Sequence, residues 1–152
     1  MNIAISDSLA LRPLTITDAT GFAAYANNRK VSDNLRDAFP KPYNIDDAER
    51  FIHSVSGNAK PNVLGIEYKK EIIGSIGIFP GDDIYRFNAE IGYWIAEPFW
   101  SLGIGTQVVN AMTDYAFNNF PLERLYARPF PFNIASIRVL EKCGYIHEAT
   151  LK

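Results

Sequence analysis

The stretch FWSLGIGTQVV (Phe99–Val109) places Gly103 and Gly105 immediately before an apolar helical pattern. The first amides of a helix have no partner inside the helix, and the helix dipole favours negative charge beside them. Glycine adopts positive φ and lets the backbone approach a phosphate closely. The stretch therefore indicates either an anion-binding loop or only a tight strand-to-helix turn, and its spacing alone leaves both open.

Two common phosphate-binding loops do not fit this stretch. A Walker loop requires a lysine directly after its last glycine, and no lysine follows either glycine here. The dinucleotide fingerprint G-x-G-x-x-G requires glycine at the position of Val108. The sequence therefore favours neither a P-loop nucleotide hydrolase nor a nicotinamide enzyme.

The composition is that of a globular protein. The chain has 152 residues, which suits a single domain over 1–152, and 47% of them are hydrophobic. Fifteen basic and 17 acidic residues give a net charge of −2, which offers no electrostatic basis for binding nucleic acid or an anionic membrane. One cysteine, Cys143, and no run of about 20 apolar residues favour a cytoplasmic protein without disulfides.

Hydrophobic periodicity predicts a mixed sheet. Short β-rich segments predict strands at 9–14, 62–68, 72–79, 86–95 and 122–127, with a last strand beginning at 145. Apolar residues at helical spacing predict helices that begin after Thr17, Asn44, Gly103 and Asn133. This order predicts an α/β (α+β) fold with a mixed, mostly antiparallel sheet and helices on both faces.

Four segments in this order resemble the GCN5-related N-acetyltransferase (GNAT) superfamily, and more closely its RimJ/RimL-type branch. They are LALRPLTITDA (9–19), FPKPYNIDDAERFI (39–52), AEIGYWIAEPFWSLGIGT (89–106) and NIASIRVLEKCGY (133–145). Together they cover essentially the whole chain. The resemblance implies acetyl-CoA as the acetyl donor and a primary amine as the acceptor, either a protein N-terminus or a small molecule. The sequence has no Cys/His/carboxylate cluster, so we expect no metal site.

The resemblance also implies where acetyl-CoA binds. The pyrophosphate is expected on the amides of the glycine loop, which are those of Leu102, Gly103, Ile104, Gly105 and Thr106. The pantetheine arm is expected to run like an added strand along Trp94, Ile95 and Ala96. This requires two strands to diverge, and we expect a β-bulge near 93–95 to separate them.

Candidate catalytic residues follow from the same resemblance. Glu90 is the candidate base for the amine, with a structural ion-paired glutamate as the alternative, and Glu97 is the second candidate. Many relatives use a tyrosine as the general acid, but Leu140 stands at that position here. Ser136 is therefore expected near the thioester sulfur as the proton donor, with an ordinary first-turn serine as the alternative. Asn133 is expected to cap the last helix and to contact the pantetheine.

Two departures from the family pattern keep a second function open. Ser101 and Leu102 stand where relatives carry a glycine and a cation, so backbone amides must hold the pyrophosphate. The family's final hairpin is absent, so either that strand lies outside this sequence or a second subunit supplies it in a homodimer. These departures favour the alternative of a non-catalytic acyl-CoA-binding or interaction domain.

Overall fold

The computed structural model describes residues 1–152, and its centre is one six-stranded sheet in which the strands follow one another in sequence order. The strands are β1 (Ile3–Ala4), β2 (Leu9–Arg12), β3 (Val63–Tyr68), β4 (Glu71–Pro80), β5 (Asn88–Ile95) and β6 (Arg124–Tyr126). Every neighbouring pair is antiparallel except β5 and β6, which run parallel. The predicted mixed, mostly antiparallel sheet is therefore confirmed.

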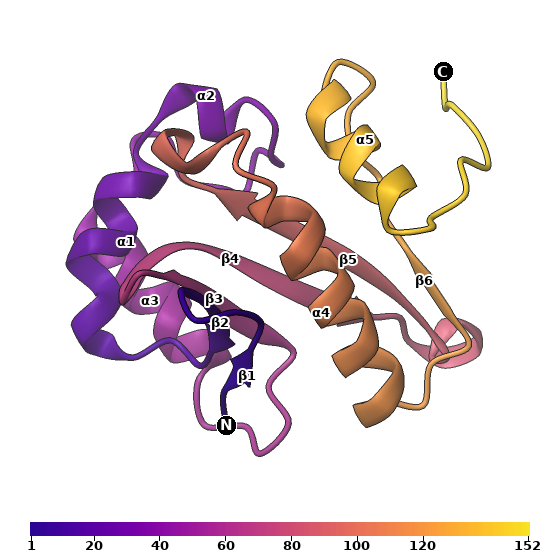
Figure 1. Ribbon diagram of the computed structural model, residues 1–152, viewed down its shortest axis with the longest axis horizontal. Helices are drawn as coiled ribbons and strands as arrows, with labels where there is room; N and C mark the ends of the chain where they lie inside the picture. Colours follow the sequence, from indigo (N-terminus) through magenta and orange to yellow (C-terminus); the bar gives the residue numbers. More distant parts are fainter.

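Helices cover both faces of this sheet (Figure 1). The α-helices are α1 (Ala19–Ala26), α2 (Arg29–Ser32), α3 (Ile45–Val55), α4 (Ile104–Asn119) and α5 (Ile134–Lys142). Three short 3-10 helices are η1 (Ile16–Asp18), η2 (Asp83–Tyr85) and η3 (Glu97–Phe99). The buried Trp94 packs edge-on against Phe22 of α1, whereas its neighbour Ile95 lies near α4, so successive residues of β5 face opposite helical layers. No helix is both long enough and apolar enough to cross a bilayer.

Polar caps fix two of the helix starts. Asn44 accepts a hydrogen bond from the Asp47 amide, and Asp47 accepts one from the Asn44 amide, so a capping box opens α3 at the predicted start after Asn44. The predicted cap at Thr17 is wrong, because Thr15 and Asp18 form the capping box one turn earlier and open η1. The short 3-10 turn then leads directly into α1.

The predicted bulge at 93–95 is not present, because β4 and β5 keep an unbroken register from Gly74–Ile95 to Pro80–Ala89. The irregularity lies instead between β3 and β4, at Ile66 and Glu67. The divergence of β5 and β6 has a different cause. Strand β6 pairs only with 88–90 of β5 and then leads away towards α5 (Figure 1).

The predicted last strand at 145 is wrong. Gly144 ends α5 at φ +85°, and the Tyr145 amide donates to Leu140 O, as in a glycine-terminated helix. The Tyr145 hydroxyl then lies 2.7 Å from Thr113 Oγ1 of α4, so the chain turns onto α4 and not along the sheet. Beyond it Ile146 is 85% exposed, and a segment without a neighbouring strand makes no ladder hydrogen bonds.

Candidate active site

Glycine is required for a different structural reason at each of the two positions in the loop before α4. Gly103 is the N-cap of α4 and adopts φ +77°, where side chains other than glycine are strained. A Cβ on Gly103 would have nothing within 4 Å, so the space beside it is open. A Cβ on Gly105 would lie 3.2 Å from Cγ2 of Val139, so Gly105 allows α5 to pack closely against α4.

The amides of 101–106 form a group of free donors. None of these six N–H groups donates a hydrogen bond to another part of the protein, and the first donor after them is Gln107, which reaches Gly103 O at 3.4 Å. A run of free amides at the N-terminus of a 16-residue helix suits an anion, since the helix dipole adds to the N–H groups. The loop therefore suits an anionic group.

Strand β5 presents a free main-chain edge beside this loop. The Ala96 amide donates to Ile73 O at 2.8 Å, so Ala96 and, by alternation, Trp94 direct their main chain towards β4. Tyr93 and Ile95 direct theirs to the opposite side, where β6 has ended. Of the three residues expected to contact pantetheine, only Ile95 directs its main chain to the open edge. Tyr93, which was not expected there, does the same. The Trp100 indole N–H donates to Ile95 O at 2.7 Å.

The first turn of α5 faces this edge with a hydroxyl pair. Asn133 caps α5 by accepting a hydrogen bond from the Ser136 amide at 3.2 Å, as predicted for the cap. The Oγ of Ser136 lies 3.1 Å from the hydroxyl of Tyr93. Burial raises the pKa of Tyr93, and the hydrogen bond with Ser136 only partly offsets this. The sequence analysis did not include Tyr93 among the site residues. Its position two residues before Ile95 on the same strand could have placed it at the same edge.

Glu90 lies on β5 and is held by two arginines. Arg36 Nη2 donates to Oε1 at 3.0 Å, while Arg128 donates to Oε2 from Nε at 2.9 Å and from Nη2 at 2.6 Å. These bonds raise the pKa of the Arg128 guanidinium. Phe79 on β4 is the cross-strand partner of Glu90. Its ring lies beside Gly92, where a Cβ would be 3.6 Å from the ring.

Two further groups are occupied elsewhere. Glu97 forms an ion pair with Lys30 at 2.9 Å and accepts a hydrogen bond from Asn28 at 3.2 Å, and the hydrogen bond from Lys30 lowers the pKa of Glu97. The thiol of Cys143 donates to Thr106 O at 3.4 Å, and burial raises its pKa. A raised thiol pKa disfavours the nucleophilic thiolate, so Cys143 is a structural residue.

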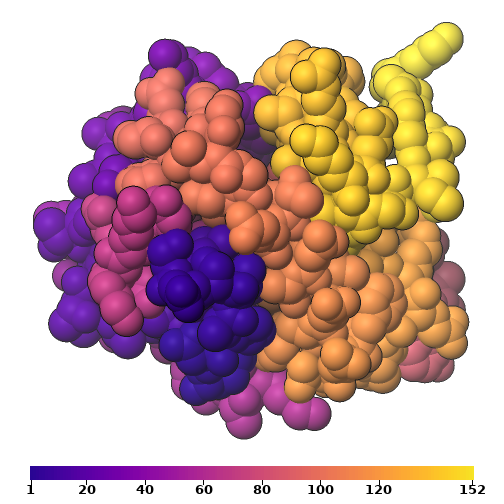
Figure 2. Space-filling model, in the orientation of Figure 1, coloured from indigo at the N-terminus to yellow at the C-terminus, as the bar shows by residue number.

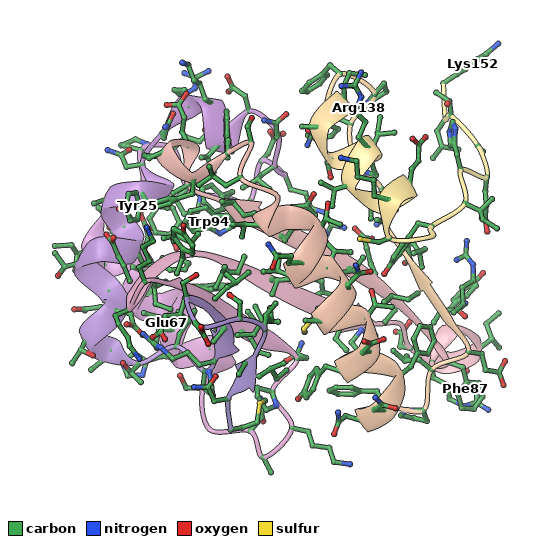
Figure 3. The ribbon with its side chains drawn as sticks, in the orientation of Figure 1. Tyr25, Glu67, Phe87, Trp94, Arg138 and Lys152 are labelled. Atoms are coloured by element: carbon green, nitrogen blue, oxygen red, sulfur yellow. The ribbon has the colours of Figure 1, made fainter.

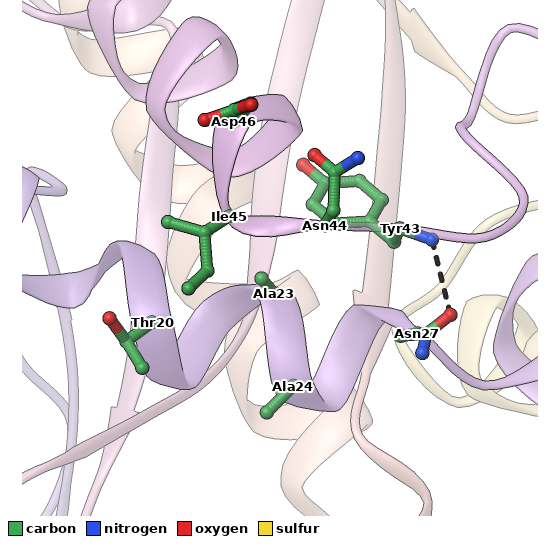
Figure 4. A pocket seen from close by; sticks show the side chains of 8 residues that line it. All are labelled: Thr20, Ala23, Ala24, Asn27, Tyr43, Asn44, Ile45 and Asp46. Carbon is green, nitrogen blue, oxygen red and sulfur yellow. Dashed lines mark hydrogen bonds between the residues drawn. The ribbon is translucent and has the colours of Figure 1, made fainter.

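The surface is hollowed between the start of α4 and α5, with the segment around α2 visible at the bottom of the hollow (Figure 2). Side chains from both sheet faces are drawn in Figure 3, where Trp94 lies on the α1 side and Arg138 on α5. A separate groove of about 550 Å³ lies between α1 and the start of α3, where the Tyr43 amide donates to Asn27 at 3.1 Å (Figure 4). It contains none of the residues expected to bind acetyl-CoA or to act in catalysis.

The sheet thus opens between the parallel strands β5 and β6, beside a loop of free amides. The chain belongs to the acetyltransferase (GNAT) domain family, whose sequence profile matches residues 8–146. It is therefore an N-acetyltransferase, and named relatives agree with this.

Three similar proteins illustrate the family. The uncharacterized N-acetyltransferase YoaA of Bacillus subtilis (strain 168) is 31% identical over 97% of this chain and 84% of its own length. The microcin C7 self-immunity acetyltransferase MccE, solved with acetyl-CoA and AMP, is 26% identical with a TM-score of 0.75, over 92% of this chain and 79% of that one. RimL, a ribosomal L7/L12 α-N-protein acetyltransferase solved with CoA, shares the fold at 21% identity and a TM-score of 0.78, over 94% and 82% of the two chains.

Proposed function

We propose that the protein transfers the acetyl group of acetyl-CoA to a primary amine by direct attack within a ternary complex. The observation that carries the proposal is the run of free amides at 101–106 before α4. The likeness to MccE, solved with acetyl-CoA, supports the same co-substrate here. In this proposal the pyrophosphate binds the amides of Leu102, Gly103, Ile104, Gly105 and Thr106.

The pantetheine arm follows the open edge of β5. Its amide groups pair with the main chain of Tyr93 and with the Ile95 N–H, in the way that an added strand pairs with a sheet edge, while Ile95 O accepts from the Trp100 indole. Trp94 and Ala96 hold this edge in place, because Trp94 packs into the core and Ala96 is bonded to β4. Asn133 positions Ser136 by capping the first turn of α5. The thioester then lies between Ser136 and Glu90.

The reaction exchanges a C–S bond for a C–N bond. The amine nitrogen attacks the thioester carbonyl, and amides of β5 stabilise the oxyanion. Glu90 receives the amine proton, directly or through water. A carboxylate has about four lone-pair positions. The arginines use three of them, which leaves one on Oε1. The C–S bond breaks, and the thiolate takes a proton from the hydroxyl of Ser136, which regains one from solvent.

Calorimetry with acetyl-CoA and thiol release with a panel of primary amines test the proposal. Binding of acetyl-CoA together with amine-dependent thiol release is the expected result. No binding at millimolar acetyl-CoA contradicts it. Binding without thiol release for any amine indicates instead the non-catalytic CoA-binding domain, which is favoured by one observation: the exposed Leu102 and Ser101 give the loop no cation.

A homodimer through β6 is a second part of the proposal. Strand β6 is the last strand of the sheet, so its outer edge has no neighbour within the chain. Unpaired edges are templates for pairing with another copy. Light scattering coupled to size exclusion tests this, and a monomer at all concentrations contradicts it.

A further inference from the structure

We propose that Arg36 and Arg128 form a carboxylate-binding subsite beside Glu90, and that the acceptor is a free amino acid or a similar small amine with a carboxylate next to its amine. This inference rests on the proposed function, because it takes Glu90 as the group that meets the acceptor amine. It names the class of acceptor, which the family alone does not give.

The two arginines reach Glu90 from segments that are far apart in the sequence. Arg36 follows α2, and Arg128 follows the end of β6, just where β6 leaves β5. Their side chains are 71% and 59% exposed, whereas that of Glu90 is 16% exposed. The cluster therefore has a shielded carboxylate and two guanidiniums that face solvent.

The cluster carries more positive charge than Glu90 balances. Two guanidiniums against one carboxylate leave a net charge of +1, and neither arginine bonds any other acidic group. Together they carry ten N–H donors. Three of these are used on Glu90, and the two guanidiniums make no other hydrogen bond. Exposed donors in planar forks match the two oxygens of a carboxylate.

A second arginine is not needed to hold Glu90. Arg128 already satisfies Oε2 with two N–H groups, and exposed ion pairs contribute little to folding stability. The surplus charge instead selects ligands. It repels a polyamine, and it attracts an amine whose carboxylate lies a few bonds away. A peptide N-terminus has an amide in place of that carboxylate and gains nothing from the arginines.

Matched acceptors isolate the carboxylate. Phenylalanine, phenylalaninamide and phenethylamine share one side chain and differ in carrying a carboxylate, a neutral amide or neither. Thiol release is measured for all three with the wild type, Arg36→Ala and Arg128→Ala. The control is Arg50→Ala, since Arg50 is also 71% exposed and also pairs with a carboxylate, that of Asp47 on α3. Each comparison between variants uses one substrate, so differences in amine basicity cancel.

We expect phenylalanine to have the highest kcat/KM in the wild type. Because a hydrogen bond to a charged group contributes about 1.5–3 kcal/mol, Arg36→Ala and Arg128→Ala should each lower kcat/KM for phenylalanine by about tenfold to a hundredfold. The ratio of kcat/KM for phenylalanine to kcat/KM for phenethylamine should fall by the same factor, because any change at Glu90 affects both acceptors alike, and Arg50→Ala should leave every substrate unchanged. Equal losses for all three acceptors, or no loss, overturn the subsite while amine-dependent thiol release still supports the proposed function.

A binding titration separates the two proposals where turnover fails. Phenylalanine is titrated into the protein loaded with CoA, and its affinity is compared among the same variants. Absence of thiol release with every acceptor contradicts the proposed function. In that case, phenylalanine binding that is lost in Arg36→Ala and Arg128→Ala supports the subsite, and binding that is absent or unchanged overturns it.

Discussion

The hydroxyl of Tyr93 lies 3.1 Å from the Oγ of Ser136, and this contact joins the open edge of β5 to the first turn of α5. The two residues are 43 positions apart in the chain. A serine in a first helical turn that faces only water has a freely rotating hydroxyl. Here the hydrogen bond with Tyr93 restricts that rotation and fixes the position of the Ser136 hydroxyl oxygen. The relationship supports Ser136 as the proposed donor and Tyr93 as a positioning residue.

Replacing Tyr93 with phenylalanine tests this relationship. A neutral hydrogen bond contributes about 1 kcal/mol, so Tyr93→Phe should lower kcat about fivefold with little change in the Kd of acetyl-CoA. Burial raises the pKa of Tyr93 above its ordinary value of 10.0, so the hydroxyl stays neutral near neutral pH. Removal of this hydroxyl should therefore shift neither limb of the pH–rate profile. In Ser136→Ala, the further change Tyr93→Phe should have no effect on kcat. Additive losses in the double variant are incompatible with action through Ser136.

Glu90→Gln tests the proposed base. General-base catalysis contributes typically about 10²–10⁴-fold, so kcat should fall by at least about a hundredfold while the Kd of acetyl-CoA stays within about twofold. Glutamine keeps the size of the side chain, and its single amide oxygen can still accept from one of the two arginines. The matched control is Glu97→Gln, because Glu97 pairs with Lys30 and is expected to have no role in proton transfer. Unchanged turnover in Glu90→Gln removes Glu90 from the mechanism.

Asp18 should make the stability of the fold depend on pH. Burial alone raises the pKa of this carboxyl, but hydrogen bonds from Arg12 and the Thr15 amide outweigh it, and the pKa lies below the ordinary value of 3.8. A lowered pKa stabilises the folded state above the unfolded value, and this stabilisation is lost as pH falls through the folded value.

Asp18→Asn should therefore lower the free energy of unfolding by about 1–3 kcal/mol at pH 7. The difference from wild type should shrink as pH falls below the ordinary value of 3.8 and through the lower folded-state pKa, where the wild-type carboxyl takes up its proton. Urea unfolding at pH 7 and at successively lower pH values measures this. A difference that is independent of pH indicates that lost packing, and not lost charge, is the cause.

Patterns within single segments predicted most of the fold. Periodicity located the strands from β2 to β6 and the longer helices, and the cap at Asn44 follows from its pairing with Asp47 three residues later. The errors come from long-range geometry. A β-rich segment after Tyr145 is not a strand, because its partner for hydrogen bonding is α4 through Thr113.

The same distinction applies to the site. The glycine loop, Asn133 and Ser136 are local features, and motifs found them. The Glu90 cluster is not local, because Arg36 lies 54 positions before Glu90 and Arg128 lies 38 positions after it. No periodicity in one segment reports a side chain that arrives from another element. Only the path of β6 away from β5 places Arg128 beside the carboxylate.

The two glycines of the loop should respond differently to substitution. Asparagine tolerates the left-handed backbone of Gly103, so Gly103→Asn should keep the fold while its side chain occupies the open space beside the free amides. We expect a loss of acetyl-CoA affinity of at least about tenfold, the equivalent of one charge-assisted hydrogen bond. Gly105→Ala should instead press on Val139 and displace α5 with Ser136, which lowers kcat more than affinity. Calorimetry and steady-state kinetics on both variants separate the effects. Wild-type affinity in Gly103→Asn would show that this glycine serves only the turn.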